Sequence, residues 1–260
     1  MHSLLTDIFD RYRRVALWCS GGKDSLTLLH HCIPWRHKVI VIHNHVDDGW
    51  PDVTENLSQL LDRWGFLRSI YTEPGISFDQ YTITFGWPVN VVPTTHDGVV
   101  QPSSPYRTSD LKLASWWHCT LTRQIQPLVT ATASIGADCI LTGSRNADGP
   151  AFAAMGQQID AGLAMRYNPL AEWTSEQVYQ YVDAHDIPLP PHYKWKRAIG
   201  YEAPDCMSCT WQPQYWAVLK RYYPKEFRRR WPQARKVFAE LETASIRLEA
   251  ALKELPPHGQ

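Results

Sequence analysis

The sequence predicts an α/β fold: a doubly wound, mostly parallel sheet with helices on both faces. Two observations predict it. Short apolar runs at residues 15–19, 38–46, 67–71 and 138–142 are typical of buried strands. Between them lie segments whose apolar residues recur at helical spacing. Strands that alternate with helices indicate a parallel sheet, and such sheets bind ligands beyond the carboxyl ends of their strands.

The first strand leads into a glycine turn, Ser20-Gly-Gly-Lys-Asp-Ser25, and then into a helix. This order of strand, glycine turn and helix points free N–H groups at an anion, usually a phosphate. Lys23 adds a mobile positive charge, and Ser20 and Ser25 add hydroxyl donors. The spacing is tighter than in the Walker-type loop, which has four residues between its first glycine and its Gly-Lys-Ser/Thr. The alternative is an ordinary strand-to-helix turn that contains two glycines.

The remaining elements follow in order along the chain. Residues 1–14 are predicted to form a helix, and the turn Asp47–Glu55 leads from the second strand into another helix. Between residues 74 and 116 the periodic pattern is interrupted by prolines, which predicts an insertion without regular elements. The later predictions are a helix at 120–135, a turn at 143–146, a short strand at 164–167, a helix opened by the capping box Thr174–Gln177, and an amphipathic helix at 237–255.

Length and composition favour one medium-sized domain with elaborations. We predict a domain at residues 1–211, with the insertion at about 74–116, and a helical extension at 212–260. The formal net charge is zero, so nucleic-acid binding would need a local basic patch. Residues 220–236 form such a cluster with interleaved aromatics; a solvated helix face or a contact to a second copy of the chain explains it equally simply. Neither a long apolar run nor a signal-peptide pattern is present, which predicts a cytoplasmic protein.

Ser20–Ser25 resembles the Ser-Gly-Gly-Lys-Asp-Ser signature of the PP-loop (adenine nucleotide alpha-hydrolase-like) superfamily, whose members act around the alpha-phosphorus of ATP or a sulfated adenine nucleotide. Further stretches are similar to one branch of it, the phosphoadenosine phosphosulfate (PAPS) reductase family. Asp47–Glu55 resembles the Asp-Thr-Gly…Pro-Glu-Thr segment of that family, with Asp48 in place of Thr. The others are Cys119–Leu128, similar to Cys-x-x-x-Lys-x-x-Pro-Leu, Thr142–Arg145, similar to Thr-Gly-x-Arg, and parts of 168–211, similar to the C-terminal core of the family.

The resemblance implies a Rossmann-like fold of the HUP type that binds an adenine nucleotide, so that residues 1–211 would be the nucleotide-binding domain. Lys23, Asp24 and Arg145 would carry catalysis, mainly by electrostatic stabilisation together with Mg²⁺. The positions that match the family's nucleotide-binding motifs are Ser20, Gly21, Gly22, Lys23, Asp24, Ser25, Asp47, Gly143 and Arg145.

Two departures from the family pattern concern cysteines. The sulfonucleotide reductases carry a catalytic cysteine in a Glu-Cys-Gly-Leu-His-like tail, whereas no cysteine follows Cys209 here, which speaks against reduction by that thiolate. Cluster-bearing members hold a [4Fe–4S] cluster with a Cys-Cys pair and a later Cys-x-x-Cys pair. This chain has His118-Cys119 and Cys206-Met-Ser-Cys209. The resemblance therefore implies a cluster on Cys119, Cys206 and Cys209 with one iron open or otherwise bound; zinc, or three reduced cysteines, are the alternatives.

Three functions are consistent with these features. The first is an ATP pyrophosphatase-type enzyme that adenylates an acceptor oxygen and couples this step to sulfur transfer. The second is a reductase of PAPS or adenylyl sulfate that uses a separate thiol donor. The third is a nucleotide-binding module that has lost catalysis and works in a complex. The partners implied are an adenine nucleotide, an acceptor that is either a nucleic acid or a small molecule, a sulfur or thiol donor protein, and a second copy of the chain as a homodimer.

Overall fold

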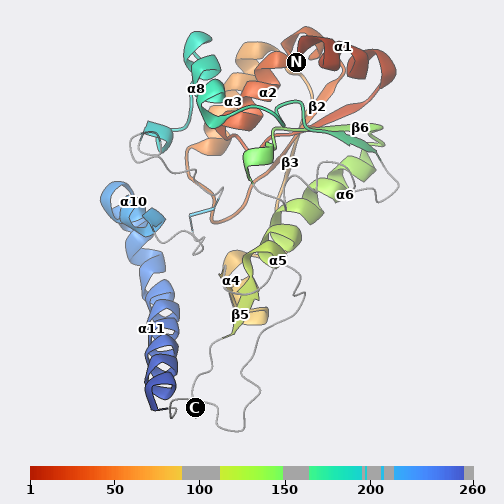
Figure 1. The fold of residues 1–260 in the computed structure, drawn as a ribbon. Coiled ribbons are helices and arrows are strands. Elements are labelled where there is room, and N and C mark those ends of the chain that lie inside the picture. The colour runs from red at the N-terminus through yellow and green to blue at the C-terminus, as the bar shows by residue number, and fades with distance from the viewer. Residues whose placement is uncertain (90–111, 149–163, 195–196, 198–205, 208–213, 255–260) are drawn as a thin grey trace, which may run out of the picture. The chain divides into compact units, whose positions relative to one another are not determined.

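The computed structural model describes residues 1–89, 112–148, 164–194, 197, 206–207 and 214–254 (Figure 1). The chain separates into two compact units. The first unit comprises Met1–Ser77 and Leu121–Cys206, and the second comprises Phe78–Thr120 and Met207–Gln260. The domain boundary expected near residue 211 stays a prediction.

The first unit is built on a sheet of five strands. All neighbouring strands in it are parallel. The chain forms three strands outward from the centre and then returns to the other side of β1, so the order reverses between β1 and β6. This is the doubly wound arrangement, and the predicted fold class is confirmed. The strands, in sheet order, are β3 (Ser69–Thr72), β2 (Val39–Asn44), β1 (Val15–Trp18), β6 (Cys139–Thr142) and β7 (Met165–Tyr167).

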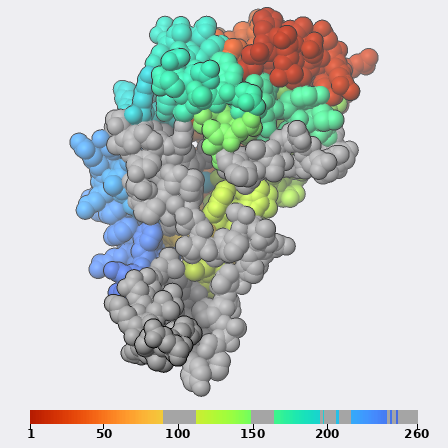
Figure 2. Space-filling model, in the orientation of Figure 1, coloured from red at the N-terminus to blue at the C-terminus, as the bar shows by residue number. Residues whose placement is uncertain are grey.

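Helices cover both faces of this sheet, because side chains along each strand alternate between the faces. Leu17 and Leu141 join the larger apolar cluster, and Trp18 and Ile140 join the smaller one against helix α6. The space-filling view shows α1, in red, and α8, in blue-green, on one side of this unit (Figure 2). One face carries α1 (His2–Arg11), α2 (Lys23–His31), α3 (Val53–Trp64) and α8 (Ser175–Ala184), and the other carries α6 (Gln126–Ser134) (Figure 1).

The start of α8 confirms the predicted capping box. The Thr174 hydroxyl accepts the Gln177 N–H at 3.2 Å, and the Gln177 side-chain oxygen accepts the Thr174 N–H at 2.8 Å. These bonds satisfy two donors that the first turn of a helix would otherwise leave unpaired. The capping box therefore fixes the residue at which α8 begins.

The stretch from residue 74 to residue 116 contains regular elements that its prolines had led us not to expect. Pro88 lies within a strand of a two-stranded parallel sheet, where a missing N–H is tolerated because each strand is an edge. Gly86 has φ of +98°, and a Cβ there would lie 2.4 Å from the Lys112 carbonyl carbon, so only glycine allows the strands this close. The elements are α4 (Phe78–Thr84), β4 (Trp87–Val89), β5 (Leu113–Ser115) and α5 (Trp116–Thr120).

The last predicted helix begins earlier than its apolar pattern indicated. Helix α10 spans Gln214–Tyr222, and α11 runs from Pro224 to Glu254 with Pro232 inside it. A proline is well tolerated at the first position of a helix. The rings of Trp231 and Phe238, on either side of Pro232, lie 6.1 Å apart and pack the helix across that proline. The basic cluster at 220–236 therefore lies on helices. Within the described ranges, a helix with the length and apolar character needed to span a bilayer is absent.

Candidate functional site

The turn between β1 and α2 is shaped by its two glycines. Gly21 has φ of +77°, and a Cβ there would lie 2.5 Å from Val53 Cγ1 at the start of α3. Gly22 is the N-cap of α2, and a Cβ there would lie 2.8 Å from the hydroxyl oxygen of Tyr193. A side chain at either position would therefore displace a neighbour, and at Gly21 it would also strain the backbone.

Hydroxyl groups hold this turn from both sides. The Ser20 hydroxyl accepts the Gly22 N–H at 3.3 Å, and the Ser25 hydroxyl donates to the Gly22 carbonyl at 3.0 Å. The hydroxyl of Tyr193 accepts the N–H of Lys23 at 3.0 Å. This N–H belongs to the first turn of α2, where amides have no helical partner and are suited to an anion. Sequence reasoning missed Tyr193 because 170 positions separate it from Lys23.

A chain of charged groups begins at the first residues of α2. The Lys23 side chain is fully buried, and its ammonium lies 3.0 and 2.8 Å from the two carboxylate oxygens of Asp24. Asp24 Oδ1 lies 2.8 Å from Nε of Arg145, whose Nη2 donates to Asp148 at 2.7 Å. Burial raises the pKa of Asp24, and the Lys23 and Arg145 cations oppose that rise without cancelling it. Asp24 thus holds both cations of the predicted catalytic group.

Gly143 explains how the turn after β6 reaches this helix. A Cβ on Gly143 would lie 2.8 Å from the Asp24 carbonyl carbon and 2.8 Å from the Ser25 nitrogen. The backbone after β6 therefore packs directly on the first turn of α2. Because β1 and β6 are the two strands at the switch point, this is the edge where doubly wound sheets bind ligands. The structure brings together here Ser20, Gly21, Gly22, Lys23, Asp24, Ser25, Gly143 and Arg145.

The remaining predicted nucleotide-binding residue, Asp47, follows strand β2 and is engaged in an ion pair. Its carboxylate contacts Nη2 of Arg123, which also lies 2.9 Å from Asp48 Oδ1. Arg123 and Asp48 are each 1% exposed, so this is a buried ion pair, and the sequence did not predict that Arg123 belongs to the site. Their pairing joins segments 75 positions apart, which no local pattern reveals. Where the family pattern has Thr, Asp48 supplies a carboxylate to balance the buried guanidinium.

Arg123 lies in a π-helical segment, Leu121–Ile125, that leads into α6. A π-helix takes one more residue per hydrogen-bonded turn than an α-helix and is frequent at functional sites. Cys119–Leu128 has ten residues, whereas the similar family pattern, Cys-x-x-x-Lys-x-x-Pro-Leu, has nine. One extra residue is what a π-helical turn can accommodate. The segment brings Arg123 to the carboxyl end of β2, where its side chain contacts Asp47 and Asp48 and Asn44 donates to its carbonyl at 2.8 Å.

The three cysteines predicted to bind metal lie in different parts of the chain. Cys119 is half-buried on α5, and Cys206 forms an isolated bridge with Gly49 and accepts a hydrogen bond from the Gln124 side chain at 3.0 Å. Cys209 lies outside the described residues. Among the described residues, no three His, Cys, Asp or Glu side chains come together as a metal-binding group. The cluster and the zinc site stay predictions.

The other cysteines lie in strand or helix patterns that predict core positions, and the structure confirms this. Cys19, Cys32 and Cys139 are each at most 2% exposed. Burial raises the pKa of the Cys139 thiol to about 12 and raises that of Cys32 as well. Both thiols therefore stay protonated at neutral pH and act as small apolar side chains.

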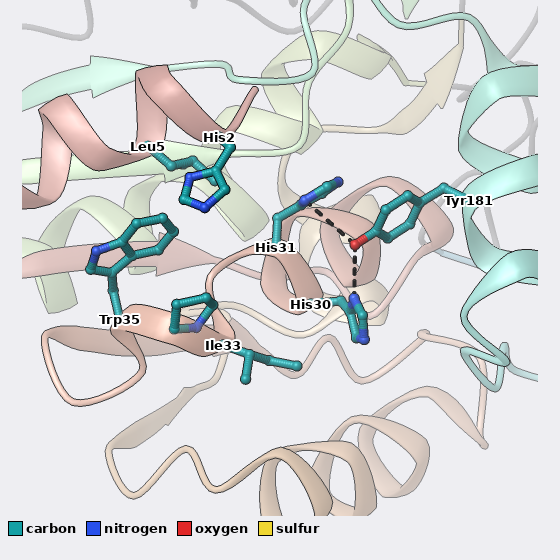
Figure 3. A pocket seen from close by; sticks show the side chains of 8 residues that line it. His2, Leu5, His30, His31, Ile33, Trp35 and Tyr181 are labelled. Carbon is teal, nitrogen blue, oxygen red and sulfur yellow. Dashed lines mark hydrogen bonds between the residues drawn. The ribbon is translucent and has the colours of Figure 1, made fainter.

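A cavity of about 300 Å³ lies at the far end of α2 from the glycine turn (Figure 3). Nine helical residues separate the two ends, which corresponds to about 14 Å. Tyr181 points into the space between two histidines of α2, with its hydroxyl 2.9 Å from His30 Nδ1 and 3.4 Å from His31 Nδ1 (Figure 3). Trp35 and His2 line the opposite wall (Figure 3). The distance along α2 keeps this cavity apart from the glycine turn.

Burial makes this histidine cluster sensitive to acid. Burial first, and then His30 and His185, lower the pKa of His31 to about 4, and the pKa of His30 is lowered as well. The unfolded chain therefore binds more protons than the folded chain between about pH 6.5 and pH 4. The contribution of neutral His31 to the free energy of unfolding is fully present above that pH window and is lost as the pH falls through it.

We expect the thermal midpoint to fall as the pH is lowered from about 7.5 to about 5, and to fall less in His31→Gln. His37→Gln, at an exposed position before β2, is the matched control and should follow the wild type. Differential scanning fluorimetry across the pH range measures this. An equal fall in His31→Gln and wild type contradicts the assignment.

Fold and turn together define a doubly wound α/β protein with a PP-loop-type turn at the switch point of its sheet. Residues 14–212 match the family model of the phosphoadenosine phosphosulfate reductase domain, and the chain belongs to that family. An adenosine 5'-phosphosulfate reductase of Burkholderia cepacia is 35% identical over 212 residues, which cover 81% of this chain and 75% of that protein. A phosphoadenosine 5'-phosphosulfate reductase of Gloeobacter violaceus is 34% identical over 94 residues, or 35% of this chain and 38% of that one.

A solved structure supports the fold. The phosphate complex of the phosphoadenylyl-sulfate reductase from Candida auris matches with a TM-score of 0.52 and 15% sequence identity, over 79% of this chain and 87% of that one. At that identity the likeness bears on the fold alone.

Proposed function

We propose that this protein is an enzyme that binds an adenine nucleotide at Ser20–Ser25 and acts at its alpha-phosphorus. The observation that carries the proposal is the chain of contacts from Lys23 through Asp24 to Arg145 at the switch point of the sheet. Two cations and the N-terminus of a helix at one place favour a ligand with several negative charges. The turn amides and Lys23 would hold the phosphates, and Asp24 would orient both cations.

The first candidate reaction is adenylation with loss of pyrophosphate. An acceptor oxygen attacks the alpha-phosphorus of ATP, and the bond from that phosphorus to the bridging oxygen of the beta-phosphate breaks. Negative charge then develops on the departing pyrophosphate, where Lys23 and the turn amides would stabilise it, together with Mg²⁺. Sulfur transfer would follow when a sulfide or thiolate displaces AMP from the adenylated acceptor. Asp47 and Asp48 follow β2 at the same sheet edge and supply the carboxylates near which Mg²⁺ would bind.

The second candidate reaction is reduction of adenylyl sulfate or PAPS, and the similarity to the Burkholderia cepacia protein favours it. In that reaction a thiolate attacks the sulfate sulfur, the nucleotide leaves, and a second thiol releases sulfite. In the sequence printed here no cysteine follows Cys209, so the attacking thiolate would come from elsewhere, such as a separate thiol donor protein. A nucleotide-binding module without catalysis is the remaining alternative.

One experiment separates these functions. The purified protein is supplied with ATP in one arm, followed by pyrophosphate release, and with adenylyl sulfate or PAPS plus a dithiol in the other, followed by sulfite release. Pyrophosphate alone supports the first reaction, and sulfite alone supports the second. Binding without either product supports the module, and failure to bind any adenine nucleotide overturns the proposal as a whole.

A [4Fe–4S] cluster on Cys119, Cys206 and Cys209 is the metal site we propose, with zinc as the alternative. Thiolates are the ligands that such clusters require, and a cluster with an open iron would supply a site for sulfide. Iron, zinc and acid-labile sulfide are measured on protein purified without oxygen, in wild type and in Cys206→Ala/Cys209→Ala. We expect about four irons per wild-type chain and their loss in the variant. If the wild-type protein contains neither iron nor zinc, both proposed metal sites are contradicted.

The acceptor in the first reaction is either a small molecule or a nucleic acid. For a nucleic acid, the basic cluster at 220–236 is the surface we propose, because exposed arginines and aromatic rings alternate there. Part of its charge is already balanced, since Glu226 pairs with Arg229 at 2.8 Å and Arg230 at 3.1 Å. The remaining cations, including Arg228 and Lys225, are exposed. A homodimer through the C-terminal helices is the other use of this surface.

A further inference from the structure

Arg166 is a buried arginine at an edge of the sheet whose side chain has no carboxylate partner in the part of the chain that the structure describes. It lies on β7, opposite Ile140 of β6, and is 7% exposed. Its Nη2 donates to the hydroxyl of Thr142 at 3.1 Å and to that of Ser144 at 3.4 Å. Its Nε and Nη1 are buried without a hydrogen-bond partner among the described residues.

The other buried arginines of the described chain are balanced by carboxylates. Arg123 contacts Asp47 and Asp48, Arg145 contacts Asp24 and Asp148, and Arg230 contacts Glu226. Arg166 has instead two neutral hydroxyls and the face of the Trp18 ring, 5.4 Å from its guanidinium carbon. Neither can cancel a full charge, and an unpaired charge in a protein interior is costly.

The guanidinium nonetheless stays charged at neutral pH. Burial lowers the pKa of Arg166 to about 10, which still leaves it protonated at pH 7. A stable positive charge with unused donors is a site for an anion. The planar fork of an arginine matches the oxygens of a phosphate or sulfate group. The Ser144 hydroxyl only accepts hydrogen bonds from Thr142 and Arg166, so its own hydrogen adds a neutral donor beside the guanidinium.

The position of the guanidinium matches that of a ligand at the switch point. The backbone of Arg166 is level with Ile140, and its side chain extends along the sheet to Thr142, the last residue of β6. The next residue, Gly143, packs on the first turn of α2. The hydroxyls that hold Arg166 therefore flank the residue that contacts the glycine turn.

We propose that Arg166, together with the hydroxyl of Ser144, forms a subsite for one oxyanion group, a phosphate or a sulfate. The Thr142 hydroxyl accepts from Arg166 and donates to Asn168, so it positions the guanidinium. The inference rests on the proposed function for the carrier of that group, an adenine nucleotide bound at Ser20–Ser25. Arg166 would bind an oxyanion of the ligand that the turn amides and Lys23 do not hold. The subsite adds a second point of attachment, which would orient the nucleotide across the edge of the sheet.

The test compares Arg166→Met, Arg166→Lys and Ser144→Ala with wild type. Thermal midpoints are measured without ligand and with inorganic sulfate or phosphate, and affinities for ATP, adenylyl sulfate and AMP are measured by calorimetry. In Arg166→Met we expect the stabilisation by inorganic anions to disappear and the affinity for ATP or adenylyl sulfate to fall by about tenfold or more. Arg166→Lys should keep part of both effects, and Ser144→Ala should show a smaller loss. Arg68→Met, an exposed change at the other edge of the sheet, should behave as wild type.

The outcomes separate this inference from the proposed function. The subsite is overturned if these variants keep the wild-type stabilisation by anions and the wild-type nucleotide affinity. The variants compared are Arg166→Lys and Ser144→Ala, and Arg166→Met where it folds. If the subsite is overturned in this way but Lys23→Met still abolishes nucleotide binding, the proposed nucleotide site at Ser20–Ser25 is supported without the subsite. If wild type binds no adenine nucleotide but is stabilised by sulfate in a manner that depends on Arg166, the subsite stands and its carrier is not a nucleotide. If Arg166→Met loses both the stabilisation by sulfate and the affinity for the nucleotide, the result supports the subsite and the proposed function.

Discussion

Replacing Lys23 with methionine is expected to weaken binding of ATP by about 30-fold, or about 2 kcal/mol, because a charge-assisted hydrogen bond contributes about that much. The Lys23 ammonium is buried beside the glycine turn, where it contacts the Asp24 carboxylate and lies 5.5 Å from the centre of the Tyr179 ring. A phosphate at the turn would share this ammonium with Asp24. Methionine is unbranched and one heavy atom shorter than lysine, so the change keeps most of the packing and removes mainly the charge. Calorimetric titration with ATP measures the effect.

The control for this prediction is Arg68→Met, which removes one positive charge from an exposed position before β3. It should leave the affinity unchanged, because an exposed charge at the opposite edge of the sheet is screened by salt. A Lys23→Met variant that melts as wild type does and binds ATP equally well contradicts the assignment of Ser20–Ser25 as the nucleotide site.

Gly143→Ala is expected to lower the free energy of unfolding by about 1–3 kcal/mol and to reduce nucleotide affinity at least about tenfold. The added Cβ would lie 2.8 Å from two backbone atoms of the first turn of α2 and 3.0 Å from the Asp24 carbonyl oxygen. Backbone atoms cannot turn aside as a flexible side chain does, so strand and helix must separate. Separation would move Arg145 away from Asp24 and disturb the chain of charges. Urea denaturation and calorimetry measure the two effects.

A matched glycine provides the control. A Cβ at Gly75 meets nothing within 4 Å, so Gly75→Ala should leave both stability and affinity near those of wild type. Equal behaviour of Gly143→Ala and Gly75→Ala would show that the turn after β6 does not need to approach α2 closely. The role that we give to the packing of β6 on the glycine turn would then be wrong.

The fold was predictable because its central strands are buried on both faces. Val15–Trp18 and Cys139–Thr142 are apolar almost throughout. A glycine turn follows each of them, beginning three positions after Trp18 and directly after Thr142. The strands β4 and β5 were missed because they lie in the stretch where prolines interrupt the periodic pattern, and one of them contains a proline. Short edge strands depend on a partner that lies elsewhere in the chain, and no periodic pattern identifies it.

The candidate site was predictable only where its residues are close in sequence. Ser20–Ser25 is one continuous motif, and Gly143 and Arg145 lie in one turn. Asp148 lies three positions from Arg145 and follows from local geometry once the turn is known. The other ion pairs and hydrogen bonds of the site join distant segments: Arg123 with Asp48, Arg166 with Thr142, and Tyr193 with Lys23. Their partners become apparent only when the sheet order is known.

The pairing of β1 with β6 has a consequence for how the protein folds. Val15 pairs with Cys139, so the central strand acquires its second neighbour only after more than half of the chain has been made. Contacts so far apart in sequence carry a large loop-closure entropy and form late and slowly. During synthesis the complete Ser20–Ser25 motif emerges early, but Gly143, Arg145 and Tyr193 reach it only once the second half of the unit is present. Ligand binding at the turn therefore reports completion of the whole first unit, and a fragment that ends before residue 139 would carry the motif without a formed site.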